Sequence, residues 1–299
     1  MNSRQLRRLS KRALRLLLKL QEPAKRAGLN HIMIEVTFVG TGSAMPPPGR
    51  GNTCFTVRTE NLLFLVDAGP TVFSDLQRAN IDPGQIDAIY LSHGHGDHIL
   101  GFPQLALLAK FAVKAKPLQV YCTATVRETV CTITRLAFPE ASDIVDRFQW
   151  IELAEGPRQS YELTDNVQLT TEVVFGPPYM PVLGLRLDFF KQGVSLAFSA
   201  DTAPSDTFAS MATGCDLLIH EASFSATLQS DASPQMVFHS DARQAGQIAA
   251  RAGAKRLALV HLSQMNGNHR RILTAEAAEN FKGLILVPED GDVIQLDKI

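Results

Sequence analysis

Short runs of β-branched and other apolar residues, separated by turn residues, recur along the chain from residue 31 onward. Runs of about four to eight such residues, bounded by glycine, proline, asparagine or aspartate, are typical of β-strands. The pattern predicts strands at Ile34–Val39, Thr53–Val57, Leu62–Val66, Ala88–Leu91, Leu118–Val120, Val167–Val174, Leu183–Phe189, Val194–Phe198, Leu217–Ile219, Arg256–Val260, Leu284–Val287 and Val293–Leu296.

Between these strands, several segments have apolar residues at the helical spacing of three or four positions. We predict a helix at Asp241–Ala252, with Ser240 as its N-cap and Gly253 as its stop. The other predicted helices are Val72–Ala79, Leu100–Val113, Val126–Ala137 and Thr207–Ala212. Because strands outnumber helices and partly follow one another as hairpins do, the pattern favours one α/β domain with two mixed sheets between helices.

The first 30 residues follow a different pattern. Leucines alternate with arginines and lysines at helical spacing up to Pro23, which predicts a basic amphipathic helix. Residues 1–30 hold nine basic residues and one acidic residue, whereas the rest of the chain holds 20 basic and 29 acidic ones, so the formal net charge of −1 is a cancellation. We therefore expect two parts, this helix at 1–30 and a main domain at 31–299. The acidic main domain excludes a strongly basic nucleic-acid-binding body.

Three interpretations of the basic helix follow from its pattern. It packs one face against the main domain or against the partner subunit of a homodimer, it contacts a membrane surface or an acidic partner, or it is the remnant of a targeting segment.

Cysteine usage and hydropathy bear on the compartment. The four cysteines lie far apart without Cys-x-x-Cys spacing, which argues against a disulfide framework and against a cysteine-based zinc site. No uncharged apolar run approaches the ~20 residues needed to cross a bilayer. We expect a soluble, cytoplasmic protein.

Three histidines and an aspartate crowd into six residues directly after one predicted strand, in the segment His93-Gly94-His95-Gly96-Asp97-His98. Nitrogen and oxygen donors at this density suit a divalent ion such as Zn²⁺, whereas burying them without a partner is costly. His93 and His95 stand two apart and can face one ion, while Asp97 and His98 begin the next helix and can face a second. Two-metal hydrolases hold their ions about 3.5–4 Å apart.

Further donors stand directly after other predicted strands. Asp67, Asp201 and His261 each follow an apolar run. An aspartate in this position is often only a turn-former. The recurrence of the same context at three strand ends favours a shared site.

These residues and their flanking motifs resemble the metallo-β-lactamase superfamily, and within it the branch of ribonuclease Z and the arylsulfatase-like hydrolases. The resemblance covers about residues 33–297 and rests on Gly40-Thr41-Gly42, Asn52-Thr53-Cys54, Val66-Asp67-Ala68-Gly69, the His93–His98 segment, Gly101-Phe102-Pro103, Phe198-Ser199-Ala200-Asp201-Thr202, Asp216-Leu217-Leu218-Ile219-His220-Glu221, His239-Ser240 and Leu259-Val260-His261. It implies a four-layer αββα sandwich of two mixed sheets.

The resemblance also implies a ligand set for one or two divalent ions, with zinc as the expected metal. In that set the first ion is held by His93 and His95, the second by Asp97, His98 and His261, and Asp201 bridges both. Asp67 resembles the outer group that orients a ligand histidine.

Three more residues have expected roles around the metals. His239 resembles the ribonuclease Z histidine beside the phosphate, where it would stabilise transition-state charge or protonate the leaving oxygen; the alternative is a capping or packing histidine. Asp97 is expected to accept a proton as well as to bind metal. His220 and Glu221 are interpreted as a supporting pair behind the ligands.

One ligand of the family pattern is missing. The family has a third histidine for the first metal shortly before the strand that here contains Leu183-Gly184-Leu185-Arg186, and Phe175 stands in its place. Phenylalanine cannot bind a metal. The first site would then be weakened, leaving a one-metal enzyme, a substitute ligand such as Glu172, or a degenerate site.

The expected function is a metal-dependent hydrolase that uses a metal-bound hydroxide, chiefly on phosphodiesters, with a small ester or an RNA 3′ region as substrate. Only 25 residues separate Phe175 from Asp201, which leaves no room for the long basic arm with which many ribonuclease Z proteins grip transfer RNA. The alternatives are an arylsulfatase-like or a β-lactam or lactone hydrolase, or a metal-poor protein that binds a ligand or partner without catalysis.

Overall fold

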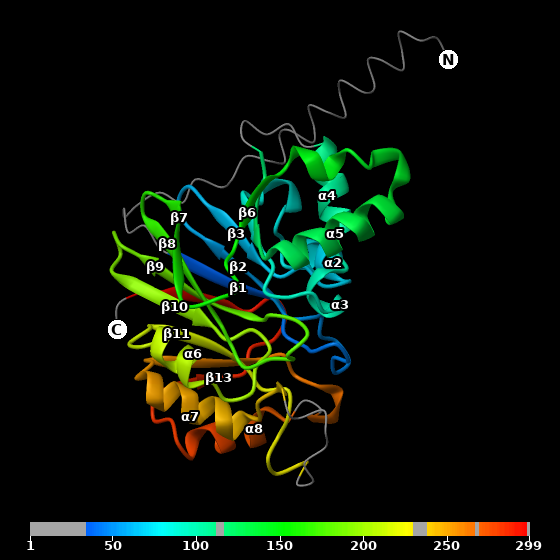
Figure 1. Cartoon of the computed structure of the whole chain (residues 1–299). Coiled ribbons are helices and arrows are strands. Elements are labelled where there is room, and N and C mark those ends of the chain that lie inside the picture. The colour runs from blue at the N-terminus through cyan, green and yellow to red at the C-terminus, as the bar shows by residue number, and fades with distance from the viewer. Residues whose placement is uncertain (1–33, 112–116, 230–237, 267–268, 298–299) are drawn as a thin grey trace. The chain divides into compact units, whose positions relative to one another are not determined.

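The computed structural model describes residues 34–111, 117–229, 238–266 and 269–297, and the strands of these segments form two seven-stranded sheets (Figure 1). The helix predicted within residues 1–30, and the domain boundary predicted after it, lie outside the described residues.

The first sheet joins an antiparallel half to a parallel half. Its strands β1, β2, β3 and β14 pair antiparallel, and β3 to β6 pair parallel. In spatial order the strands are β14 (Val293–Leu296), β1 (Ile34–Gly40), β2 (Cys54–Arg58), β3 (Leu63–Val66), β4 (Ala88–Tyr90), β5 (Gln119–Cys122) and β6 (Gln149–Glu152).

The second sheet is also mixed. Strands β7 to β10 pair antiparallel, and β10 to β13 pair parallel. In spatial order the strands are β13 (Leu284–Leu286), β12 (Arg256–Val260), β11 (Leu217–Glu221), β10 (Val194–Phe198), β9 (Leu183–Phe189), β8 (Val167–Val173) and β7 (Gln159–Thr164).

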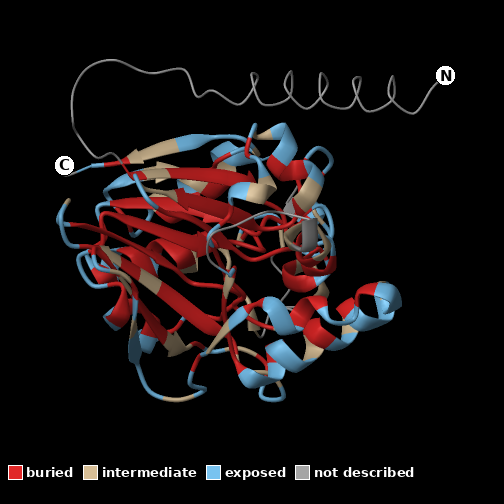
Figure 2. Cartoon of the chain, turned by 90° about the horizontal axis from the view of Figure 1, so that it is seen from above, coloured by how far each residue is buried: buried red, intermediate tan, exposed pale blue. Residues whose placement is uncertain are grey.

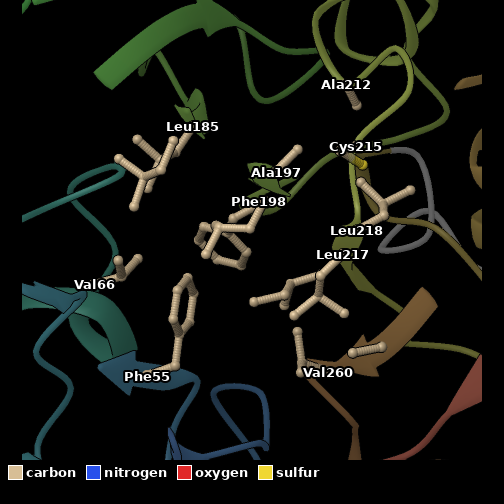
Figure 3. Packing of buried hydrophobic residues seen from close by; sticks show 14 of the residues in the cluster. Phe55, Val66, Leu185, Ala197, Phe198, Ala212, Cys215, Leu217, Leu218 and Val260 are labelled. Carbon is tan, nitrogen blue, oxygen red and sulfur yellow. The ribbon is translucent and has the colours of Figure 1, made fainter. Parts of the chain in front are cut away.

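The two sheets pack face to face, and β3 shows why its sequence is continuously apolar. Phe64 and Val66 point into the core between the sheets, whereas Leu63 and Leu65 point to the helices on the outer face. Alternate residues of a strand face opposite sides, so a strand covered on both sides needs apolar residues throughout. Figure 3 shows the inner layer, where the ring of Phe55 meets that of Phe198 edge-on at 5.2 Å.

Helices cover the outer face of each sheet (Figure 1). On the first sheet lie α2 (Val72–Arg78), α4 (Phe102–Phe111) and α5 (Ala124–Ala137), with the short α3 (Gly96–Ile99) at its edge; on the second lie α6 (Asp206–Met211), α7 (Ala242–Ala252) and α8 (Arg270–Ala278). Short 3-10 turns occur at Pro83–Gln85, Pro139–Ala141, Ile144–Arg147 and Gln264–Asn266. Burial is concentrated in the strands and exposure on the outer helix surfaces (Figure 2). The predicted αββα sandwich is confirmed.

Three elements escaped the sequence pattern. β6 and β7 are the outermost strands of their sheets, and polar, exposed residues interrupt their apolar pattern, as is common in edge strands. The third, α8, buries Leu273, Glu276 and Ala277, so its inward face lacks a continuous apolar stripe. None of the helices in the described segments is long and apolar enough to span a bilayer.

The start of α7 differs by one residue from the prediction. Asp241, not Ser240, is the N-cap, and it forms a capping box with Gln244. Ser240 Oγ instead donates to the carbonyl of Thr202 (2.7 Å) and ties the helix start to the segment after β10. Gly253 ends the helix in the left-handed conformation (φ 61°), as predicted.

Candidate metal centre

The parallel strands of both sheets end at the same edge of the sandwich, and the predicted donors follow those ends. Asp67 follows β3, His93 comes three residues after β4, Asp201 three residues after β10, and His261 directly after β12. The carboxyl ends of parallel strands are the usual place for ligands in open α/β sheets. The topology thereby brings together residues up to 194 positions apart in sequence.

Several of these turns contain non-glycine residues in the left-handed backbone conformation. Asp67 (φ 61°), Ala200 (φ 51°) and His261 (φ 59°) are three of the four non-glycine residues with positive φ in the described segments. Such conformations cost about 1–3 kcal/mol each and persist where the surrounding structure imposes them. Their concentration at the donor residues indicates that the fold places these side chains against a local backbone preference.

Four donors form one compact group, made of Asp97, His98, Asp201 and His261, and their ligand atoms all lie within 4.8 Å of one another. His98 Nε2 lies 3.4 Å from each of three atoms, namely His261 Nε2, Asp97 Oδ2 and Asp201 Oδ2. His261 Nε2 is 3.2 Å from Asp201 Oδ2 and 3.3 Å from Asp97 Oδ2.

A second group contains His93, His95 and Asp201. His93 Nε2 lies 3.1 Å from His95 Nδ1 and 3.7 Å from Asp201 Oδ2. In the described part of the chain this group has three members, one fewer than the first. Asp201 belongs to both groups, which is the position a bridging carboxylate requires.

Hydrogen bonds behind the ligands decide which nitrogen of each histidine faces the groups. His98 Nδ1–H donates to Asp67 Oδ2 (2.8 Å). The hydroxyl of Ser92 also donates to Asp67 Oδ2 (2.9 Å), so His93 Nδ1–H must donate to Ser92 Oγ (2.9 Å). When either histidine is neutral, its one ring proton is therefore on Nδ1, and its Nε2 lone pair points to the donor group.

Glu221 has the same role for His261. The hydroxyl of Ser223 donates to Glu221 Oε2, so His261 Nδ1–H donates to Ser223 Oγ (2.8 Å). His93, His98 and His261 therefore each direct Nε2 toward the carboxylate of Asp201. A histidine binds a divalent metal through such a nitrogen while its other ring nitrogen donates to a supporting group. The residues fit a site for such ions.

The local electrostatics keep the carboxylates ionised. Burial disfavours their charge, but His98 and His261 outweigh it and hold the pKa values of Asp97 and Asp201 below the ordinary range. Burial, together with the neighbouring His98, lowers the pKa of His93 well below its usual value. Anionic carboxylates and a neutral His93 are the protonation states that metal ligands need. Burial also disfavours the charge of His98, but the neighbouring Asp201, Asp97 and Asp67 outweigh it and raise the pKa of His98 well above its usual value, so a metal ion would displace its Nε2 proton on binding.

His239 stands beside the donors, in a cavity of about 390 Å³ that is also lined by His95, Asp97, Asp201 and His261. Its ring stacks on that of His261 at 5.6 Å. Burial lowers its pKa, but the Glu221 carboxylate, 3.0 Å from Nδ1, reverses this and raises the pKa of His239 to about 9. His239 is therefore a cation at neutral pH, with Nε2 left to face a ligand.

Three residues considered in the sequence take other positions. His220 is adjacent to Glu221 on β11 but faces the opposite way, with its ring against Phe208, so the structure brings only Glu221 to His239. Glu172 pairs with Arg158 (2.8 Å) and is in neither donor group.

Phe175 is 56% exposed, and its ring packs against that of Phe238 at 6.3 Å. Its carbonyl accepts hydrogen bonds from Ala203 N (3.0 Å) and Thr202 Oγ1 (3.3 Å), directly after Asp201. Phe175 thus lies next to the donor segment without contributing a ligand atom.

Sequence reasoning missed Ser92 and Ser223, the two hydroxyls that fix the histidine tautomers. Ser92 directly precedes the histidine cluster, and that adjacency is the one signal that could have identified it. Ser223 lies 38 residues from the histidine it supports, and no spacing rule connects the two.

Replacing Ser223 with alanine removes the acceptor of the His261 Nδ1–H bond. We expect zinc affinity to fall about 10- to 100-fold, the effect usual for losing a group behind a metal ligand. Competition with a chromophoric chelator measures this. Ser225→Ala is the matched control, because that buried hydroxyl donates to Glu276 (2.6 Å), away from the donors. Wild-type affinity in Ser223→Ala would show that the serine does not orient His261.

A two-sheet sandwich with helices on both faces and a histidine–aspartate centre at the ends of its parallel strands has the architecture of the metallo-β-lactamase fold. The chain belongs to the beta-lactamase superfamily: residues 63–262 match the family described as the beta-lactamase superfamily domain.

Named relatives are similar over most of this chain. Ribonuclease Z of Halorubrum lacusprofundi is 28% identical over 316 aligned positions, covering 88% of this chain and 97% of that protein. Human tRNase Z, short form, superposes with a TM-score of 0.67 at 26% identity, over 87% of this chain and 98% of that one. YhfI of Bacillus subtilis, a metallo-beta-lactamase fold protein, gives a TM-score of 0.72 at 23% identity, over 88% and 99%.

Proposed function

We propose that the protein is a metal-dependent hydrolase that cleaves phosphodiesters. The observation that carries this proposal is the pair of donor groups that share Asp201 and open, together with the His239 cation, into one cavity. The similarity to ribonuclease Z supports a phosphodiester as the substrate, either a small one or one at the 3′ region of an RNA.

Zinc is the ion we propose, because imidazole nitrogens and carboxylate oxygens are its usual ligands alongside thiolates. His98, His261, Asp97 and Asp201 would hold one ion, and His93, His95 and Asp201 another. When bound, such ions lower the pKa of water toward neutrality and offset negative charge on phosphoryl oxygens.

The chain's own groups have separate tasks in the reaction. His239 carries a proton that it can give to the departing ester oxygen, and Glu221 keeps the ring oriented through Nδ1. The positive ring also favours a phosphodiester anion in the cavity. Asp97 is positioned to accept a proton as well as to bind metal.

The cysteines bear on the compartment in which the protein works. All four cysteines are buried and unpaired, which supports our proposal of a reducing compartment such as the cytoplasm. A homodimer, and a membrane-surface or acidic partner for residues 1–30, stay predictions.

Comparing three chromogenic substrates on the zinc-loaded protein tests the reaction class. We expect bis-p-nitrophenyl phosphate to be hydrolysed at least about tenfold faster than p-nitrophenyl sulfate or a chromogenic β-lactam, because the chain is similar to ribonucleases, whose substrates are phosphodiesters. Faster turnover of the sulfate or the lactam would overturn the phosphodiesterase proposal. No turnover of any substrate would favour a binding protein.

A further inference from the structure

Part of the cavity lining is apolar. It is formed by Met45, Phe224 and Met265, together with the small residues Ser43, Ala44 and Ser263. Met45 is 60% exposed and Met265 54% exposed, whereas most large apolar residues of the described segments are buried. We call Met45, Phe224 and Met265 the methionine wall.

The methionine wall is built on backbone fixed against the metal centre. The amide of Gln264 donates to the carbonyl of Met45 (2.8 Å), and the amide of Ser43 donates to the carbonyl of Leu262 (3.0 Å). Leu262 directly follows the metal-binding candidate His261, so the segment that carries Met45 is bonded to the strand end that carries the donor. The Phe224 ring contacts His239 edge-on at 6.0 Å.

The charge of the cavity limits what can occupy it. Among its described lining residues there is no lysine or arginine. Several phosphates of a polyanion would therefore find no partners beyond the metal centre. One phosphate at the donors, followed by an uncharged group on the apolar wall, matches this distribution.

Resting on the phosphodiesterase function above, we propose that the methionine wall is a subsite for an aromatic ring carried next to the scissile phosphate, either an aryl ester group or a nucleobase. Thioether sulfur and an aromatic edge both interact favourably with aromatic rings. The volume of about 390 Å³ suits one ring with its phosphate, since pockets for small ligands span about 300–1,000 Å³.

Calorimetric binding of phosphate monoesters to the zinc-loaded full-length chain tests the subsite without turnover. We expect phenyl phosphate to bind roughly tenfold or more tightly than methyl phosphate, because its ring is partly removed from water. In the double variant Met45→Gln/Met265→Gln this ratio should fall toward one, with methyl phosphate affinity unchanged. Leu136→Gln is the matched control, since Leu136 is 75% exposed on α5, outside the cavity.

A comparison with uridine 5′-monophosphate identifies the ring. Tighter binding of the nucleotide than of phenyl phosphate, lost in the double variant, supports a nucleobase; the reverse order supports an aryl group. Equal affinity of methyl and phenyl phosphate, or a ratio unchanged in the double variant, would overturn the subsite. If neither monoester bound, the phosphodiesterase proposal would fail first, and the subsite with it.

Discussion

Replacing Asp201 with alanine is expected to lower turnover of bis-p-nitrophenyl phosphate by about 10³-fold or more, the scale of losing several kcal/mol of charge stabilisation at a metal centre. Asp201 is the one residue that belongs to both donor groups, so its loss weakens both at once. Metal content, measured by mass spectrometry of the purified protein, should fall together with turnover.

The control for this variant is Glu172→Gln, which changes a carboxylate outside both donor groups. Thermal melting should show that Asp201→Ala still folds, because removing a carboxylate from a cluster of histidines leaves the sheet core intact. A folded Asp201→Ala protein with near-wild-type turnover would refute the metal centre.

Replacing His239 with alanine is expected to lower kcat by about 10²- to 10⁴-fold, the usual contribution of a positioned proton donor. The loss should be larger for thymidine 5′-phenyl phosphate than for thymidine 5′-p-nitrophenyl phosphate, because phenolate is the poorer leaving group and needs the proton more. Zinc content should stay at the wild-type level, since His239 is a member of neither of the two proposed ion-binding groups.

His269→Ala is the matched control, because His269 is exposed at the start of α8, away from the cavity. Equal losses for the two thymidine esters would assign His239 to charge stabilisation without proton transfer. Wild-type kcat for both esters would exclude either role.

The architecture was largely predictable because the core imposes a simple pattern. Strands such as β3 and β10 are covered on both faces and appear as continuous apolar runs. The edge strands β6 and β7 have one exposed side and few apolar residues, so no comparable signal marked them. Resemblance to a known family supplied the order of the layers, which periodicity alone does not determine.

The donors could be anticipated because metal chemistry requires particular residue types at strand ends. His93, His95, Asp97 and His98 are adjacent in sequence, and the structure places Asp201 and His261 beside them. What could not be predicted depends on long-range geometry. The hydroxyl of Ser223 fixes the tautomer of His261 only because β11 and β12 are neighbours.

The direction of individual side chains was the other feature that the sequence did not predict. His220 and Glu221 are consecutive and were expected to act as a pair, yet alternation along β11 directs His220 toward Phe208 and Glu221 toward His239. The methionine wall had no sequence signal, because Met45 and Met265 are 220 residues apart and reach the same cavity through backbone hydrogen bonds that include those of Leu262 and Gln264.

The central claim is that the two donor groups hold divalent ions and that these ions support phosphodiester hydrolysis. Titrating zinc into metal-stripped protein, while following both binding and turnover of bis-p-nitrophenyl phosphate, tests it directly. We predict two binding steps, a tight one for the four-donor group and a weaker one for the three-donor group, with turnover that appears only as zinc binds. Turnover that is independent of zinc, or a folded protein that binds none, would contradict it.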